Sequence, residues 1–314
     1  MSGWFFAILQ TAVMVMGAPL VAGWVKLVKC KLQNRKGPAP WQPYRDLAKL
    51  FGKDVVIAES ASPIFRTAPY VVFSVTALAS SVIPLFMVNL PTSAIADVIV
   101  LVGFFALARF FLALAGMDIG TAFGGMGSSR EMTISSLAEP AMLLAIFTLV
   151  MTVESTNLST VIQDLAVAPF QLHPSFIFAA MSMILVAMAE TGCIPIDNPA
   201  THLELTMIHE AMILEYSGRH LALMEWAAML KLMIYEVLIV NLFLPWGVAL
   251  HFSPRDLFIA LAAVIGKIML LSVMLAVSET AMAKMRLFRV PHFLGLAFIL
   301  SLIGILSHVI LEVN

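Results

Sequence analysis

Stretches of about 20 apolar residues recur along the chain, and they constrain its fold more than any other feature. A bilayer core about 30 Å thick is crossed by a helix of roughly this length. Apolar residues make up 61% of the 314 residues, and charged residues only 12%, against roughly a quarter in soluble domains. The sequence therefore predicts an all-α integral membrane protein, a single polytopic domain over 1–314. About eight transmembrane helices are expected, at about 3–25, 69–88, 97–115, 133–153, 174–190, 221–245, 257–278 and 292–311.

The basic residues predict how these helices are oriented. Fourteen of the eighteen Lys and Arg residues fall in four loops, at about 26–68, 116–132, 191–220 and 279–291. On the opposite side, the loops contain only Arg255. Because positively charged loops stay on the cytoplasmic side, the four loops are expected to be cytoplasmic. Both termini are then expected on the periplasmic side of a prokaryotic inner membrane.

The first cytoplasmic loop contains a short stretch with helical periodicity. In WQPYRDLAKLFGKD, Pro43 is typical of a helix start, and Tyr44, Leu47, Ala48 and Phe51 recur at helical spacing. We expect a short amphipathic helix that lies on the membrane surface or under a docked subunit.

The third cytoplasmic loop collects acids and histidines. Its sequence, AETGCIPIDNPATHLELTMIHEAMILEYSG, covers residues 189–218. Two prolines interrupt its first part, which is expected to be irregular, and a helix is predicted from about His202 to Gly218. The pair His209-Glu210 begins an H-E-x-x-H motif, but Ile213 stands at the second histidine position, so a zinc-protease helix is excluded. We expect these groups to form hydrogen bonds, to bind a partner or to transfer protons. The set comprises Glu190, Asp197, His202, Glu204, His209, Glu210 and Glu215.

Six further ionisable residues lie within the predicted spans: Arg109, Glu139, Glu225, Lys231, Glu236 and Lys267. A charge at membrane depth costs a few kcal/mol or more, so such a residue normally faces a partner group or a hydrated interior. Partners for Lys231 and Glu236 are expected on other helices, while Arg109 and Glu225 lie near span ends from which they can reach water. Two interpretations stay open: structural ion pairing, and a proton path.

The chain has few groups that hold redox cofactors. Cys30 and Cys193 are its only cysteines, and neither belongs to a C-x-x-C pair. Iron–sulfur clusters with four thiolate ligands therefore have to belong to partner subunits. No metal site, cofactor site or catalytic residue is predicted in this chain.

Three separated segments resemble one known family. They are RKGPAPWQPYRDLAKLFGKD at 35–54, REMTISSLAE at 130–139 and AETGCIPIDNP…HEAMILEYSG within 189–218. These segments are similar to the subunit 1 family of respiratory complex I and of the related membrane-bound nickel–iron hydrogenases. The resemblance covers nearly the whole chain, and it implies a membrane subunit that anchors a peripheral redox arm and links it to antiporter-like subunits.

The resemblance also implies roles for individual residues. It implies contact with the redox arm for Arg35, Lys36, Gly37, Pro38, Asp46, Lys49, Arg130 and Glu131. It matches Arg130 and Glu139 to an Arg and a Glu that begin and line the fourth span. It matches Glu190, Asp197, Glu204 and Glu215 to acids of a loop which, in complex I, adjoins a quinone cavity and a proton route.

One departure from the complex I pattern indicates the branch. Gly192 and Cys193 replace the Asn-Arg of quinone-reducing members, and NPATHLELTMIHE replaces their Glu-rich segment. This resembles the energy-converting hydrogenases, including formate hydrogenlyase and hydrogenase-4 type complexes. The implied partners are hydrogenase-like large and small subunits carrying a nickel–iron centre and iron–sulfur clusters, together with antiporter-like subunits that move protons or sodium. Quinone binding is disfavoured.

Two alternatives stay open. The chain is a quinone-site subunit of a complex I-type NADH:quinone oxidoreductase, or it is an independent secondary transporter. The sequence lacks the internal repeats of many transporters, and its long basic loop also argues against the second alternative.

Overall fold

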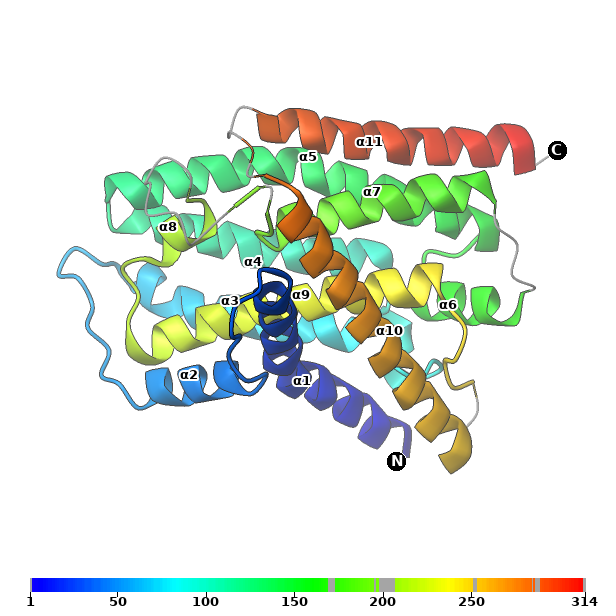
Figure 1. Ribbon diagram of the computed structural model, residues 1–314, viewed down its shortest axis with the longest axis horizontal. Helices are drawn as coiled ribbons and strands as arrows, with labels where there is room; N and C mark the ends of the chain where they lie inside the picture. The colour runs from blue at the N-terminus through cyan, green and yellow to red at the C-terminus, as the bar shows by residue number, and fades with distance from the viewer. Residues whose placement is uncertain are drawn as a thin grey trace.

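The computed structural model describes residues 2–168, 173–194, 196–197, 207–250, 253–283, 285 and 289–312. Within these residues the chain is helical, with two isolated β-bridges and no named strand (Figure 1). Its α-helices are α1 (Ser2–Leu32), α2 (Gln42–Phe51), α3 (Pro63–Val82), α4 (Val98–Asp118), α5 (Ala122–Val153), α6 (Leu158–Val167), α7 (Pro174–Glu190), α8 (His209–Ile213), α9 (Gly218–Phe243), α10 (Pro254–Ala281) and α11 (Val290–Ser307). A 3₁₀-helix η1 (Pro91–Ile95) and a C-terminal π-turn η4 (His308–Glu312) complete the set.

The expectation of a multi-pass membrane protein is confirmed. Among the described residues, six helices are long and apolar enough to cross a bilayer: α1, α4, α5, α9, α10 and α11. The apolar helix α7 has 17 residues and is shorter than these, and the 20-residue α3 is not among the six. The count of eight spans therefore stays a prediction.

Helix α9 runs through the middle of the molecule and contacts α1, α2, α3, α6, α7 and α10 (Figure 1). On one side α5, α7 and α11 pack against one another, and on another side α3 and α4 form a pair. Helices α1 and α10 contact each other and α9, and both leave much of their apolar surface exposed. This arrangement buries Tyr235 and Leu238 of α9 in the main hydrophobic core.

Several helix boundaries differ from the sequence prediction. The first helix continues to Leu32, well past the predicted end, and α6 lies in an expected periplasmic loop. Helix α5 begins at Ala122, where the Thr121 hydroxyl accepts from the Gly124 N–H, so the predicted loop 116–132 shrinks to a few residues. Apolar periodicity marks only the lipid-depth part of a helix, and these helices extend beyond it.

The amphipathic helix that we expected between the first two spans is confirmed as α2. Pro43 and Leu47 of this helix are buried, while Ala48 and Phe51 are exposed. The Tyr44 hydroxyl donates to the Met16 carbonyl oxygen, which ties α2 to α1. Helix α2 therefore packs against the bundle through one narrow face.

The predicted helix between His202 and Gly218 is wrong in its described part. Only His209–Ile213 forms a helix, α8, and Gly218 begins α9 instead of ending the preceding helix. Gly218 has a φ of +55°, and a Cβ there would lie 2.7 Å from the Asp54 carbonyl oxygen, so the position favours glycine. His202 and Glu204 lie outside the described residues.

Candidate functional site

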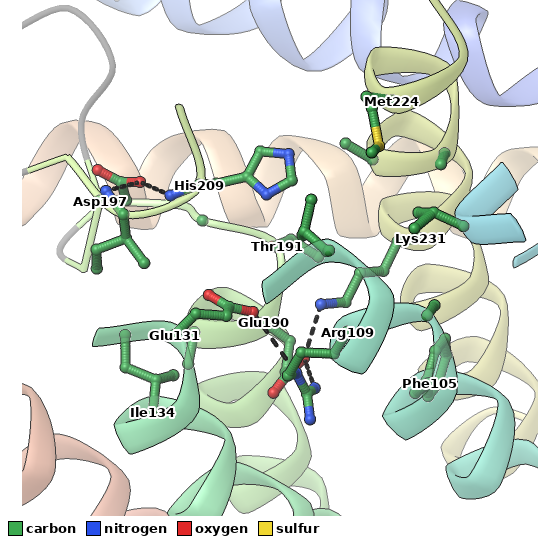
Figure 2. Close-up of a pocket in the computed structure, with 18 of the residues that line it drawn as sticks. Phe105, Arg109, Glu131, Ile134, Glu190, Thr191, Asp197, His209, Met224 and Lys231 are labelled. Atoms are coloured by element: carbon green, nitrogen blue, oxygen red, sulfur yellow. Dashed lines mark hydrogen bonds and ion pairs between the residues drawn. The ribbon is translucent and has the colours of Figure 1, made fainter. Parts of the chain in front are cut away.

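A cavity of about 240 Å³ lies where α4, α5, α7 and α9 meet (Figure 2). We call it the central cavity. Its charged lining includes Arg109 of α4, Glu131 of α5, Glu190 of α7 and Lys231 of α9. The turn after α7 and the start of α8 close one side, and apolar residues line much of the remaining wall. Charged groups from four helices therefore share one enclosed space.

Glu190 is the centre of this charge cluster. Its Oε2 accepts from Arg109 Nη2 at 2.5 Å and from Lys231 Nζ at 2.7 Å (Figure 2). The Glu190 side chain is 2% exposed, and the Lys231 side chain is 22% exposed. One carboxylate oxygen thus joins α4, α7 and α9. The expectation that the partner of Lys231 comes from another helix is confirmed.

Arg109 gathers two more acids around its guanidinium. Glu139 pairs with its Nη1, and Glu131 Oε1 lies 3.5 Å from its Nε. Arg109 is buried with its side chain 4% exposed, so the expectation that it reaches water is wrong. Three acids and two bases give the fully ionised cluster of Arg109, Glu131, Glu139, Glu190 and Lys231 a net charge of −1. The cluster therefore contains one acid more than its two bases can pair one to one.

Asp197 fixes the segment that closes the cavity. Its Oδ2 accepts from the backbone N–H groups of Ile208 and His209, each at 3.2 Å. The first N–H groups of a helix lack partners within the helix, so the carboxylate holds the start of α8 in place. Gly127 of α5 allows α8 to approach closely, since a Cβ there would lie 2.9 Å from the Ile208 carbonyl oxygen.

The His209 side chain lines the central cavity, and Figure 2 shows its ring on the same side as Thr191. Its Nε2 is buried and has no hydrogen-bond partner among the described residues. Burial lowers the pKa of His209, so the ring is neutral near pH 7. Glu210 also lines the cavity. His209 therefore offers a neutral ring nitrogen beside the buried acids.

Two residues expected at the redox-arm interface have contacts inside this chain. The Arg130 Nη1 donates to the Met207 carbonyl oxygen at 2.9 Å, which ties α5 to the segment before α8. Glu131 lies in the central cavity and not on the outer surface. The prediction placed both residues at the cytoplasmic end of a span. Helix α5 instead continues through this region, so neighbouring residues point to different sides of the helix.

The other predicted interface residues lie on the accessible loop around α2. Arg35 and Lys36 are exposed between α1 and α2, and Lys49 is exposed on α2. Gly37 and Pro38 follow in the same loop and are half-buried. Asp46 accepts from Gln42 Nε2 at 2.8 Å within α2. Their contact with a redox arm stays a prediction.

Four predicted proton-path residues belong neither to the cluster of five nor to the lining of the central cavity. Both Glu236 carboxylate oxygens accept from the Ser272 hydroxyl, at 2.9 and 3.0 Å, so the partner of Glu236 comes from α10 as expected. Lys267 Nζ donates to the Leu244 carbonyl oxygen at 2.6 Å and to that of Trp246, so it binds carbonyls at the C-terminal end of α9. Glu225 is half-buried and Glu215 is exposed.

Sequence reasoning missed one buried acid, Glu279. Its Oε2 lies 2.7 Å from Lys29 Nζ, and its side chain is 3% exposed. It stands close to the end of a predicted span, where an acid is expected to reach the surface. The sequence did contain a signal for this residue, because Glu279 is a single acid in a stretch that is otherwise apolar and uncharged.

The two cysteines lie apart from the charge cluster and form no disulfide. Among the described residues, no group of three or more His, Cys, Asp or Glu side chains is arranged to hold a metal ion. Cys30 and Cys193 are free thiols, and burial raises the pKa of Cys193.

Comparison with known proteins gives concordant matches over most of the chain. The NADH dehydrogenase family matches residues 5–309. Hydrogenase-4 component C of Escherichia coli K12 is 33% identical over 296 residues, which cover 94% of this chain and 93% of that protein. Formate hydrogenlyase subunit 4 of the same organism is 30% identical over 302 residues, which cover 96% of this chain and 97% of that protein.

A solved structure has the same fold. It is the structure of the membrane-bound sulfane sulfur reductase, an archaeal respiratory membrane complex. One of its chains superposes with a TM-score of 0.79 at 18% sequence identity, covering 98% of this chain and 99% of that chain.

Proposed function

We propose, from the premise that this chain belongs to the NADH dehydrogenase (complex I subunit 1) family, that it is a non-catalytic membrane subunit of an ion-translocating hydrogenase-type complex. The names of two relatives, hydrogenase-4 component C and formate hydrogenlyase subunit 4, support this branch. In this proposal the chain anchors hydrogenase-like large and small subunits, which carry the nickel–iron centre and the iron–sulfur clusters. It transmits their reaction to antiporter-like subunits that move protons or sodium.

The observation that carries the proposal is the shared position of Glu190 between Arg109 and Lys231. When a proton neutralises an acid of the cluster, Arg109 and Lys231 lose part of the negative charge that holds them at Glu190. Lys231, which is the more exposed cation, then reorients toward water or another acid. An unpaired charge within the bilayer is costly. A change in the charge or position of one residue is therefore expected to shift the pairing of the other residues in the cluster.

A short segment of backbone connects Glu190 to the residue that holds α8, and this connection supports a coupling role. Glu190 ends α7, and the turn that follows leads through Thr191 and Gly192 to Asp197, which holds α8. A shift of Glu190 is therefore transmitted along the backbone to the segment beside the expected redox arm. Glu236 and Lys267 extend the proposed charge route toward the other end of α9.

The volume of the central cavity is relevant to the alternative function, quinone binding. A volume of about 240 Å³ is below the range of about 300–1,000 Å³ that is typical of small-molecule pockets. A quinone with an isoprenoid tail needs more space than this. The central cavity is therefore too small to enclose a whole quinone, which agrees with the proposed hydrogenase branch.

Affinity purification through a tag on this chain tests the proposal. We expect a hydrogenase-like large subunit, an iron–sulfur subunit and an antiporter-like subunit to co-purify, and redox turnover with an artificial donor to survive in the purified complex. Specific labelling of this chain by a photoreactive quinone, with competition by quinone-site inhibitors, would support the complex I alternative instead. Ion transport by the purified chain alone in vesicles would support the transporter alternative.

A further inference from the structure

A second buried ion pair joins the ends of α1 and α10, away from the central cavity. Lys29 lies in the last turn of α1, and its Nζ is 2.7 Å from Glu279 Oε2. The Lys29 side chain is 29% exposed, whereas the Glu279 side chain is 3% exposed. An acid this deeply buried is stabilised only if its partners are well placed.

Glu279 also holds the turn that follows α7. Its Oε1 accepts from the Ile194 backbone N–H at 3.3 Å. Beside it, Val25, Met188, Cys193 and Leu275 pack together as a small apolar cluster. The carboxylate therefore links three elements through its two oxygens, and we call the contact of Lys29, Glu279 and Ile194 the Glu279 junction.

Each arm of the Glu279 junction continues into a segment with an expected function. On the α1 side, the Arg35 N–H donates to the Cys30 carbonyl oxygen at 2.8 Å, so the expected redox-arm loop begins directly on the last turn of α1. Gly37 then returns toward this turn, since a Cβ there would lie 3.0 Å from Cys30 Cβ. On the other side, Ile194 follows Glu190 by a single turn.

We propose that Glu279 is a positioning residue that transmits displacement of the redox-arm loop at 35–38 to the turn after Glu190. The inference rests on the proposed function, because it assumes that a redox arm docks on this loop. When docking or turnover shifts the last turn of α1, Lys29 moves one oxygen of Glu279, and the other oxygen moves Ile194. The backbone then carries the shift back to Glu190.

Substitutions at the junction separate its two contacts. Lys29→Gln removes the ion pair and leaves the bond to Ile194. Glu279→Gln also removes the ion pair, while its amide oxygen can still accept from Ile194. Lys29→Arg keeps the positive charge. Lys31→Gln is the matched control, because Lys31 is exposed in the same last turn.

The readout is the number of ions moved per redox turnover by the whole complex in proteoliposomes, at equal amounts of assembled complex. We expect Lys29→Gln and Glu279→Gln to lower this ratio about twofold or more, since residues that carry coupling change it by such amounts. Lys29→Arg should restore the ratio, Lys31→Gln should leave it unchanged, and the double variant should be no worse than the single ones.

Three results would overturn the inference. The first is an unchanged ratio in assembled Lys29→Gln and Glu279→Gln complexes. The second is a parallel loss of redox turnover and ion movement, which shows a merely structural role. The third is failure of Lys29→Gln to assemble while Lys31→Gln assembles. If the wild-type complex moved no ions, the proposed function itself would fail, whereas normal wild-type coupling with insensitive variants would refute only the role of Glu279.

Discussion

The burial of Glu190 predicts that its neutralisation is far more costly than that of Glu139, although both acids pair with Arg109. The Glu190 side chain is 2% exposed and is bound by two cations, whereas the Glu139 side chain is 28% exposed. Removing one partner of a buried ion pair costs about 3–5 kcal/mol, and removing an exposed pair about 0–1 kcal/mol. Glu190→Gln removes the Lys231–Glu190 ion pair, but Lys231 is partly exposed and regains some hydration.

We therefore expect Glu190→Gln to lower the free energy of unfolding by about 3 kcal/mol, at the lower end of the range for buried pairs. Glu139→Gln should lower it by about 1 kcal/mol or less. The assay is reversible unfolding of the purified chain in mixed dodecylmaltoside and SDS micelles, followed by circular dichroism. Both variants make the same chemical change beside the same arginine, and they differ in burial and in the second cation, Lys231, that Glu190 binds. Equal losses for the two variants would refute the argument that burial at Glu190 sets its importance.

Three further predictions concern single residues. Burial and a raised pKa should protect Cys193 from maleimide at pH 7 in the folded, purified chain while Cys30 reacts, and mass spectrometry finding equal labelling would contradict this. Because burial lowers the pKa of His209 below 6.5, the unfolded chain binds more protons, and stability falls as pH drops below about 6.5. His209→Gln should flatten the dependence of Tm on pH between about pH 7.5 and 5.5, and an unchanged slope would count against this burial. Gly127→Ala should cost about 1–3 kcal/mol of unfolding free energy by displacing α8, whereas Gly125→Ala, which meets no atom within 4 Å, should cost nothing; equal effects would contradict the close approach.

The sequence predicted the broad architecture because the bilayer imposes it. Apolar length identified the helices, and prolines identified the irregular segment after Glu190. It could not fix the helix ends, because α5 begins before Arg130 in a polar stretch where apolar periodicity is lost. Propensity alone also predicted too long a helix before Gly218, where the close approach of the Asp54 carbonyl oxygen leaves no room for a Cβ.

The sequence identified most residues of the candidate site, but it did not predict which of them contact one another. Lys231 and Glu190 could be recognised because they are ionisable residues in an apolar chain. An ionisable side chain is costly to place within the bilayer, so each was expected to have a role. Their pairing required the packing of α7 on α9, which no local pattern encodes. For the same reason Glu131 was assigned to the surface, and Glu279 was overlooked although it is more deeply buried than Lys231.

The most direct test of the central claim is the simultaneous measurement of redox turnover and ion uptake in proteoliposomes that contain the whole complex with Lys231→Gln. If the charge cluster couples the redox reaction to ion movement, this variant keeps turnover with an artificial donor and loses most of the ion uptake per turnover. Glu59→Gln, an exposed acid in the loop after α2, should match the wild type. Normal ion uptake per turnover in the assembled Lys231→Gln complex would contradict the account.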